Sequence, residues 1–406
     1  MANKPRIRFR GFTEDWEQRK LGDIATFSKG NGYSKSDLSA SGNPIILYGR
    51  LYTNYETTIR NVDTFVELKD KSVISQGGEV IVPASGETAE DISRASVVKN
   101  QGVIIGGDLN VIKVNSLLDP TFLALTISNG EQQKELSKRA QGKSVVHLHN
   151  SDLQEVNLIF PLLNEQKEIS TIFEKMDNII TLHQCKLKKL NLAKKSLLQK
   201  LFPRNGSQIP GVRFKGFTDA WEQRKLIYIF NDFIVPMRDK PKVFSGTTPW
   251  TRIEDIEGRY INTSLSGQFV SDETIKSMNL KVIPKGSLIV SASATFGVVA
   301  IVNNDLITNQ TFIGLVPNKD FDIDFLYSLF EAPTTKGKLL KLSAGSTIFY
   351  IARESFENLV LSVPSKEEQI KISKVFKSID DSITLHQRKL ERLQEVKKGL
   401  LQKMFV

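Results

Sequence analysis

Residues 160–202 read FPLLNEQKEISTIFEKMDNIITLHQCKLKKLNLAKKSLLQKLF, and residues 363–405 read VPSKEEQIKISKVFKSIDDSITLHQRKLERLQEVKKGLLQKMF. Aligned without gaps, 22 of the 43 positions are identical. Apolar residues recur in both stretches at alternating steps of four and three, which average the 3.5-residue period of a coiled coil. The chain is therefore expected to contain two long, related helices that pair along an apolar seam.

Each predicted seam has ten positions, of which eight are apolar. They are Ile169, Phe173, Met176, Ile180, His183, Leu187, Leu190, Lys194, Leu197 and Leu201 in the first stretch, and Ile372, Phe376, Ile379, Ile383, His386, Leu390, Leu393, Lys397, Leu400 and Met404 in the second. Histidine and lysine fall at the same positions in both, where a polar residue fixes register at some cost in stability. Metal or proton chemistry at the histidines is the less favoured alternative.

Charge is graded along both stretches. Residues 165–182 sum to −2 and 183–202 to +6, while residues 367–385 sum to −1 and 386–405 to +4. Two such helices attract when antiparallel and repel when parallel, although the gradient also complements each helix macrodipole. We expect an intramolecular antiparallel pair with one insert domain at each end and a pseudo-twofold axis between them.

A shorter repeat precedes each insert. Residues 8–21 (RFRGFTEDWEQRKL) recur as 213–226 (RFKGFTDAWEQRKL), with 11 of 14 positions identical. The inserts between short and long repeats match only in scattered positions, so one scaffold carries two different inserts. The predicted boundaries are a first domain at 1–159, a helix at 160–202, a linker at 203–212, a second domain at 213–362 and a second helix at 363–406.

Composition excludes several classes of protein. Hydrophobic content of 40% and charged content of 25% are ordinary for a globular chain. No run of about 20 apolar residues occurs, the first residues lack the apolar core of a secretory signal, and the single cysteine, Cys185, allows no internal disulfide. We therefore expect a cytoplasmic protein. The net charge of +10 favours polyanionic partners, but most of it lies on the helical stretches, so any nucleic-acid face on an insert must be a local patch.

Polar and aromatic residues cluster in both inserts where no core period explains them, as at Tyr48 to Tyr55, Trp250-Thr251-Arg252 and Arg259-Tyr260. Basic side chains neutralise phosphates, while Arg, Asn, Ser and Thr can read base edges. The predicted DNA-binding residues are Lys29, Tyr33, Lys35, Tyr48, Arg50, Tyr52, Asn54, Tyr55, Ser85, Arg94 and Lys143 in the first insert, and Arg238, Lys240, Lys242, Thr251, Arg252, Ser291, Ser293, Thr295 and Arg353 in the second. The alternative is ordinary solvated loops whose aromatic rings pack into the core.

No catalytic or metal site emerges. Adjacent prolines do not occur, which removes the Asn/Asp-Pro-Pro-aromatic motif of amino-methyltransferases. The stretch 142–144 resembles the end of a phosphate loop, but Ser137 stands where that loop requires glycine. His147 and His149 lack an evident third ligand. We predict no catalytic residue and no metal.

With these features together, the chain resembles the specificity (S) subunits of type I restriction–modification systems over its whole length. Trp16 to Leu21 and Trp221 to Leu226 match the way the recognition domains of that family begin. Leu153 to Ile169 and Phe356 to Ile372 match the entry to the family's repeat helix. Residues 32–38 and 46–53 resemble one recurring class of first recognition domain.

The resemblance implies a fold of two α/β (α+β) target-recognition domains, joined by two long helices in an antiparallel coiled coil with a pseudo-twofold internal repeat. It implies a non-catalytic subunit that binds double-stranded DNA at a bipartite target, one half-site per domain. Two modification subunits, which methylate adenine at N6, and two restriction subunits are the expected partners. S-adenosylmethionine, ATP and Mg are expected on those partners and no cofactor on this chain. A self-sufficient enzyme and a coiled-coil adaptor that binds no DNA are the alternatives.

Overall fold

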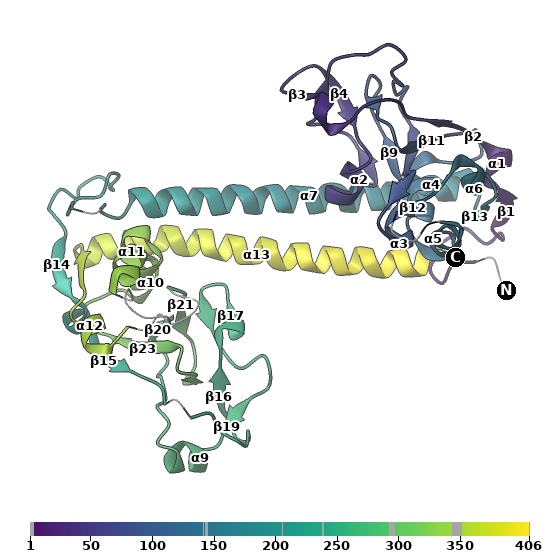
Figure 1. Ribbon diagram of the computed structural model, residues 1–406. Coiled ribbons are helices and arrows are strands. Elements are labelled where there is room, and N and C mark those ends of the chain that lie inside the picture. The colour runs from purple at the N-terminus through teal and green to yellow at the C-terminus, as the bar shows by residue number, and fades with distance from the viewer. Residues whose placement is uncertain are drawn as a thin grey trace. The chain divides into compact units, whose positions relative to one another are not determined.

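The computed structural model describes residues 4–140, 142, 145–204, 206–237, 239–291, 297–342 and 351–405. Two compact units divide the chain: unit 1 contains residues 1–184 and 389–406, and unit 2 contains residues 185–388. Two long helices, α7 (Leu163–Lys200) and α13 (Lys366–Met404), each contribute one half to either unit (Figure 1). Unit 1 is therefore completed by the C-terminal turns of the chain.

The two helices pair in opposite directions within each unit. In unit 1, Phe173 of α7 packs against Phe405, just beyond the end of α13, with ring centroids 5.9 Å apart. In unit 2, Phe376 of α13 packs against Phe202, just beyond the end of α7, at 5.8 Å. The early part of each helix thus meets the end of the other, which confirms the antiparallel coiled coil. All predicted seam positions are buried or half-buried.

Unit 1 is built on a five-stranded mixed sheet in the order β2-β11-β7-β9-β5, in which only β9 and β5 are parallel. A four-stranded sheet (β10-β4-β6-β3) and two strand pairs (β1-β13 and β12-β8) accompany it. The strands are β1 (Glu17–Lys20), β2 (Ala25–Lys29), β3 (Leu38–Ser39), β4 (Asn43–Ile46), β5 (Thr58–Ile59), β6 (Phe65–Val66), β7 (Glu79–Pro83), β8 (Ser85–Gly86), β9 (Ser96–Val98), β10 (Ile104–Ile105), β11 (Leu109–Val114), β12 (Val146–His147) and β13 (Asn157–Phe160).

Unit 2 repeats this plan with a different sequence. Its large sheet has the order β15-β23-β20-β21-β18-β17, its parallel pair is again β21 with β18, and β19-β16-β22 and β14-β24 complete it. The strands are β14 (Glu222–Lys225), β15 (Phe230–Ile234), β16 (Thr248–Thr251), β17 (Ile256–Glu257), β18 (Tyr260–Ile261), β19 (Phe269–Val270), β20 (Leu288–Ser291), β21 (Val299–Val302), β22 (Ile307–Thr308), β23 (Phe312–Pro317) and β24 (Val360–Val363). Five strands follow the same order as in unit 1, and β17 is an additional edge strand, which confirms two mixed α/β domains of one plan.

Short helices surround the sheets. Unit 1 has α1 (Leu21–Ile24), the 3-10 turn η1 (Lys35–Asp37), α2 (Arg50–Thr53), α3 (Ala89–Ile92), α4 (Pro120–Ile127), α5 (Gly130–Arg139) and α6 (Asn150–Gln154). Unit 2 has α8 (Leu226–Ile229), η2 (Ile253–Asp255), α9 (Asp272–Ser277), α10 (Ile323–Glu331), α11 (Pro333–Leu342) and α12 (Arg353–Glu357). The apolar helices α4 and α10 occupy the two cores, and each begins at an aspartate cap, Asp119 or Asp322.

Residues 103–114 contain two strands, β10 and β11, rather than one. Between them, Asp108 adopts a left-handed φ of 58°, and Gly30 approaches so closely that a Cβ on it would lie 2.0 Å from the carbonyl oxygen of Gly106. The helices α4 and α5 are separated by Asn129, whose backbone is extended, and α5 begins at Gly130 with a φ of 74°.

The short repeats tie each domain to the first turn of its helix. Arg8 holds Glu165 through two hydrogen bonds of 2.8 and 2.6 Å, and Arg213 holds Glu368 in the same way at 2.9 and 2.7 Å. Both glutamates are almost fully buried, with 1% and 2% of the side chain exposed. The Glu165 partnership raises the pKa of the Arg8 guanidinium. These equal contacts explain why both arginines and both glutamates recur in the sequence.

No helix within the described residues is long and apolar enough to cross a membrane. The same residues hold no group of three or more histidine, cysteine, aspartate or glutamate side chains placed to bind a metal ion.

Candidate nucleic-acid interface

One candidate face of unit 1 is aromatic and lies where α2 meets the β8–β12 pair. Tyr52 donates its hydroxyl to the carbonyl oxygen of Ser85 at 2.8 Å, and burial raises the pKa of that hydroxyl. Tyr48 lies edge-on to Tyr52 with ring centroids 6.4 Å apart and is 40% exposed. Opposite Ser85 in the strand pair lies His147, which is exposed. The structure thus brings Tyr48, Tyr52 and Ser85 together and adds an imidazole.

A second candidate face surrounds η1. The Tyr33 hydroxyl is 2.6 Å from Ser72 Oγ, and Lys69 Nζ lies 4.8 Å from the centroid of the Tyr33 ring. Lys69 also pairs with Asp37 at 2.5 Å; this contact, with hydrogen bonds from Ser34, lowers the pKa of the Asp37 carboxyl to about 2. Lys29 and Lys35 are exposed here and form no ion pair within the described part of the chain. Their ammonium groups are free for phosphate contacts.

Arg50 has a different environment from the one expected of a base-reading residue. Its guanidinium donates to Glu56 at 2.7 Å, to the carbonyl oxygen of Asn61 at 2.9 Å and to Asp63 at 3.1 Å, and only 11% of the side chain is exposed. These bonds fold residues 50–63 onto themselves. Arg50 therefore shapes the loop, and in this conformation it does not present its guanidinium to a groove.

Two further predicted residues of unit 1 are engaged in contacts within the domain. Tyr55 donates to the carbonyl oxygen of Ala95 at 3.2 Å and to Ser128 at 3.1 Å, and burial raises the pKa of its hydroxyl. Arg94 pairs with Asp91 at 2.6 Å and is half-buried. Asn54, between these elements, is exposed.

In unit 2, the exposed candidates are Lys240, Lys242 and Arg353. Lys240 lies 5.4 Å from the centroid of the Phe244 ring. Arg353 is 53% exposed and pairs along α12 with Glu357 at 2.6 Å. Of these three side chains, the structure places Lys240 and Lys242 on the same segment before β16.

Other predicted residues of unit 2 are internal. Thr251 and Ser291 are buried, because each lies on a central strand of its sheet, so neither side chain is available at the surface. Arg252 is half-buried and donates to Gln268 at 2.7 Å. The predicted surface cluster Arg259-Tyr260 is also corrected, since Arg259 is 2% exposed. Lys143, Arg238, Ser293 and Thr295 lie outside the described residues.

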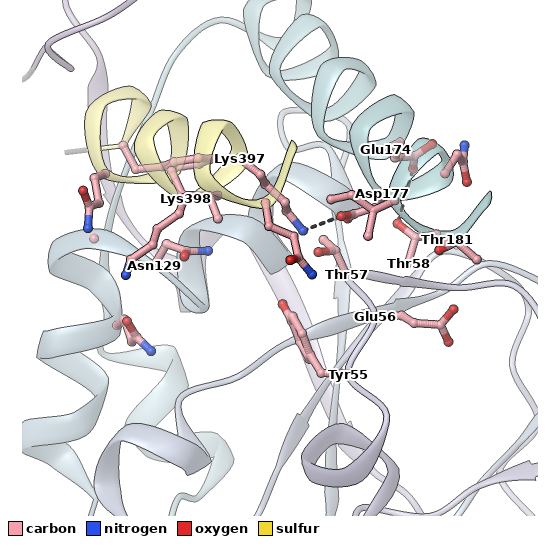
Figure 2. Close-up of a pocket in the computed structure, with 18 of the residues that line it drawn as sticks. Tyr55, Glu56, Thr57, Thr58, Asn129, Glu174, Asp177, Thr181, Lys397 and Lys398 are labelled. Atoms are coloured by element: carbon pink, nitrogen blue, oxygen red, sulfur yellow. Dashed lines mark hydrogen bonds and ion pairs between the residues drawn. The ribbon is translucent and has the colours of Figure 1, made fainter. Parts of the chain in front are cut away.

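Unit 1 also contains a polar groove of about 1390 Å³ that the sequence does not predict. It lies between residues 54–61, α5, α7 and the last turns of α13. Figure 2 shows Thr57, Thr58 and Glu174 around it, with the ion pair between Lys397 and Asp177 crossing from one long helix to the other. Acidic and basic side chains alternate along its walls, which gives no uniform field for DNA.

Sequence reasoning missed Lys69 and His147 as candidate interface residues. His147 was considered only as a metal ligand; it ends β12, and its ring stacks on that of His149, the residue before α6, with centroids 6.3 Å apart. Lys69 carries no comparable signal in the sequence, because it lies 36 positions after Tyr33 and meets it only when the chain folds back.

A duplicated helical scaffold that carries two domains of equal topology and unlike surfaces defines a protein with two separate recognition surfaces. The model of the type I restriction modification DNA specificity domain matches this chain twice, at residues 13–192 and 221–395. The chain belongs to that family, and it is a type I restriction–modification specificity subunit with two specificity domains.

Relatives and solved structures agree with this assignment. The chain is 22% identical over 399 residues to the putative type I restriction enzyme MjaX specificity subunit of Methanocaldococcus jannaschii, covering 96% of this chain and 92% of that protein. It is 22% identical over 408 residues to the MjaVIII specificity subunit of the same organism, covering 96% and 91%. The crystal structure of a type I S subunit from M. genitalium superposes with a TM-score of 0.67 at 16% identity, over 99% of both chains, which shows the same fold.

Proposed function

We propose that this chain binds a bipartite DNA target, one half-site per domain, and recruits modification and restriction subunits that carry all the catalytic chemistry. The observation that supports this most strongly is the duplication itself. Five strands of the two large sheets share their order and their parallel pair, while the exposed candidates differ: Lys29, Lys35 and Tyr48 in unit 1 against Lys240 and Lys242 in unit 2. Two domains with the same arrangement of strands but different surface residues are consistent with recognition of two different half-sites.

The paired helices would set the length of the unspecified stretch of DNA between the two half-sites. A helix lengthens by 1.5 Å per residue, and base pairs along each strand of DNA rise by about 3.4 Å. Buried seams along both helices make the pair stiff, so a fixed helix length converts into a fixed number of base pairs.

The test is to express the chain with its modification subunit in a methylation-free host and map N6-methyladenine across the genome. We expect a single motif of two short half-sites around a fixed unspecified gap. Absence of methylation despite a stable complex would favour the alternative of a coiled-coil adaptor that binds no DNA. S-adenosylmethionine, ATP and Mg would be held by the partner subunits.

The docking surface for two identical modification subunits is expected on repeated, exposed residues. The strands β1 and β14 share the sequence EQRK, and all eight side chains are exposed, whereas the flanking Trp16 and Leu21 are buried and explained by the core. The lysines of the two strands contact equivalent positions, Lys20 with Glu155 and Lys225 with Asn358, and the arginines pair alike with Glu17 and Glu222. These contacts leave all eight side chains exposed, and identical exposed residues in two unlike domains support a shared external partner.

Charge reversal tests this docking surface. Arg19→Glu or Arg224→Glu alone should leave one modification subunit bound, and both together should leave none, because each removes one of two equivalent contacts. Mass measurement of the purified complex gives the stoichiometry. Lys113→Glu, on an exposed strand position outside the repeats, is the matched control and should retain two subunits. Two bound subunits in the double variant would exclude these strands.

A further inference from the structure

Each domain packs against the long helix that follows it. We call this contact between domain and helix the joint, and the joints of the two units can be compared position by position. Asp119 caps α4 and Asp322 caps α10 with the same backbone bond. The carbonyl oxygen of Thr57 accepts from the backbone of Val97, as that of Arg259 accepts from Ile301. These anchors make Thr121 equivalent to Asp324, and the aligned helix repeats make Glu174 equivalent to Lys377.

In unit 1 the helix supplies the acid of the joint. Arg60, just after β5, pairs with Glu174 of α7 at 2.8 Å. Thr121 on α4 and Thr58 on β5 donate to the same carboxylate at 3.0 and 3.3 Å. Glu174 therefore binds three polar side chains of the domain, one of them cationic.

In unit 2 the polarity is reversed. Lys377 of α13, at the position of Glu174, pairs with Asp324 of α10 at 3.3 Å. Asp324 also forms an ion pair with the buried Arg259 at 2.8 Å, and the Arg259 guanidinium lies 4.6 Å from the centroid of the Tyr327 ring. Here the domain supplies the acid that faces the helix, and the helix supplies the base.

The contact between the two long helices is not reversed. Lys194 pairs with Asp380 at 2.7 Å in unit 2, and Lys397 pairs with Asp177, its repeat equivalent, in unit 1. Only the contacts between domain and helix differ. One of these differences also lies at the groove of unit 1, where Thr57 stands at the position that the longer Arg259 fills in unit 2.

We infer that the charges of each recognition domain are complementary to those of its own long helix. The piece of this chain that can be exchanged is therefore the domain together with the first turns of that helix. A domain moved without its helix meets a like charge: Arg60 would face Lys377, and Asp324 would face Glu174. Juxtaposed like charges penalise the wrong pairing, which fixes the order of the two domains along the chain. The inference rests on the structure of the joints and not on the proposed function.

Two reciprocal exchanges within the full chain test it. The first exchanges residues 22–159 with 227–362, which mismatches both joints. The second exchanges residues 22–177 with 227–380, which moves Glu174 and Lys377 with their domains and keeps the helix register. Amide hydrogen exchange of α4 and α10 measures how firmly each domain is held. We expect exchange in the first chimaera to be faster than in the second by up to about five-fold at each joint, the range for partly exposed ion pairs.

A pair of point substitutions gives a second test of the charges at the two joints. Glu174→Lys with Lys377→Glu should speed amide exchange of α4 and α10 in the natural chain and slow it in the first chimaera, because the reversed charges match only the exchanged domains. Lys188→Glu with Glu391→Lys, at exposed and repeat-equivalent helix positions away from the joints, is the control and should change neither. If the first chimaera does not fold, Arg60→Glu should rescue Glu174→Lys in the natural chain. The same effect of the paired reversal in both arrangements, or no rescue by Arg60→Glu, would contradict charge complementarity between each domain and its own helix.

Discussion

A chain in which residues 22–159 are replaced by the first insert of another specificity subunit is expected to direct methylation to a motif with one new half-site and one unchanged half-site. The physical reason is that each domain has its own core, one built on Phe122 and the other on Phe325, and that no strand of the described residues is shared between their sheets. Because the candidate DNA-facing side chains of each unit belong to its own insert, replacing one set leaves the other in place.

Mapping of N6-methyladenine in a methylation-free host measures this outcome. The donor insert should carry a basic residue at the position of Arg60, so that the joint with Glu174 is retained. The reverse replacement, of residues 227–362, serves as the control and should change only the other half-site. A motif that changed in both halves, or in neither, would contradict one half-site per domain.

Periodicity predicted the parts of the fold that long, repeated contacts define. Phe173 and Phe376 recur in the heptad pattern, and the structure places both in helix seams and in the cores of their units. The graded charge predicted the antiparallel direction, because it is a property of whole helices rather than of one contact. Strand order was not predictable, since it depends on pairings such as that of β5 with β9, about 40 residues apart.

The candidate interface was less predictable, because composition does not distinguish a solvated arginine from a structural one. Arg50 and Arg259 both lie in polar, aromatic stretches, yet one is held by two acids and a carbonyl oxygen and the other stacks on Tyr327. Their acidic partners lie 6 to 121 residues away in the sequence, as Glu56 and Asp380 show. Lysines such as Lys29 and Lys242 are exposed, because an ammonium group is rarely buried without a partner, and their contact with DNA stays a prediction.

The contact of the short repeat with the long helix is the second place where a large effect is expected. Arg8→Ala should lower the free energy of unfolding of unit 1 by about 3 kcal/mol, because it leaves the charge of Glu165 buried without its partner. Arg213→Ala should do the same to unit 2 through Glu368. Urea denaturation, followed by amide hydrogen exchange of α4 for unit 1 and α10 for unit 2, measures each loss separately.

Two controls make this prediction specific to a buried, unpaired charge. Arg19→Ala removes an arginine whose pair with Glu17 is about half exposed, so it should cost less than about 1 kcal/mol. Adding Glu165→Gln to Arg8→Ala should recover part of the loss, because the amide carries no charge to desolvate. Equal losses for Arg8→Ala and Arg19→Ala would show that the repeated arginine is kept for a partner rather than for folding. A loss confined to α4 after Arg8→Ala, with α10 unchanged, is the expected result, since each short repeat holds only the helix of its own unit.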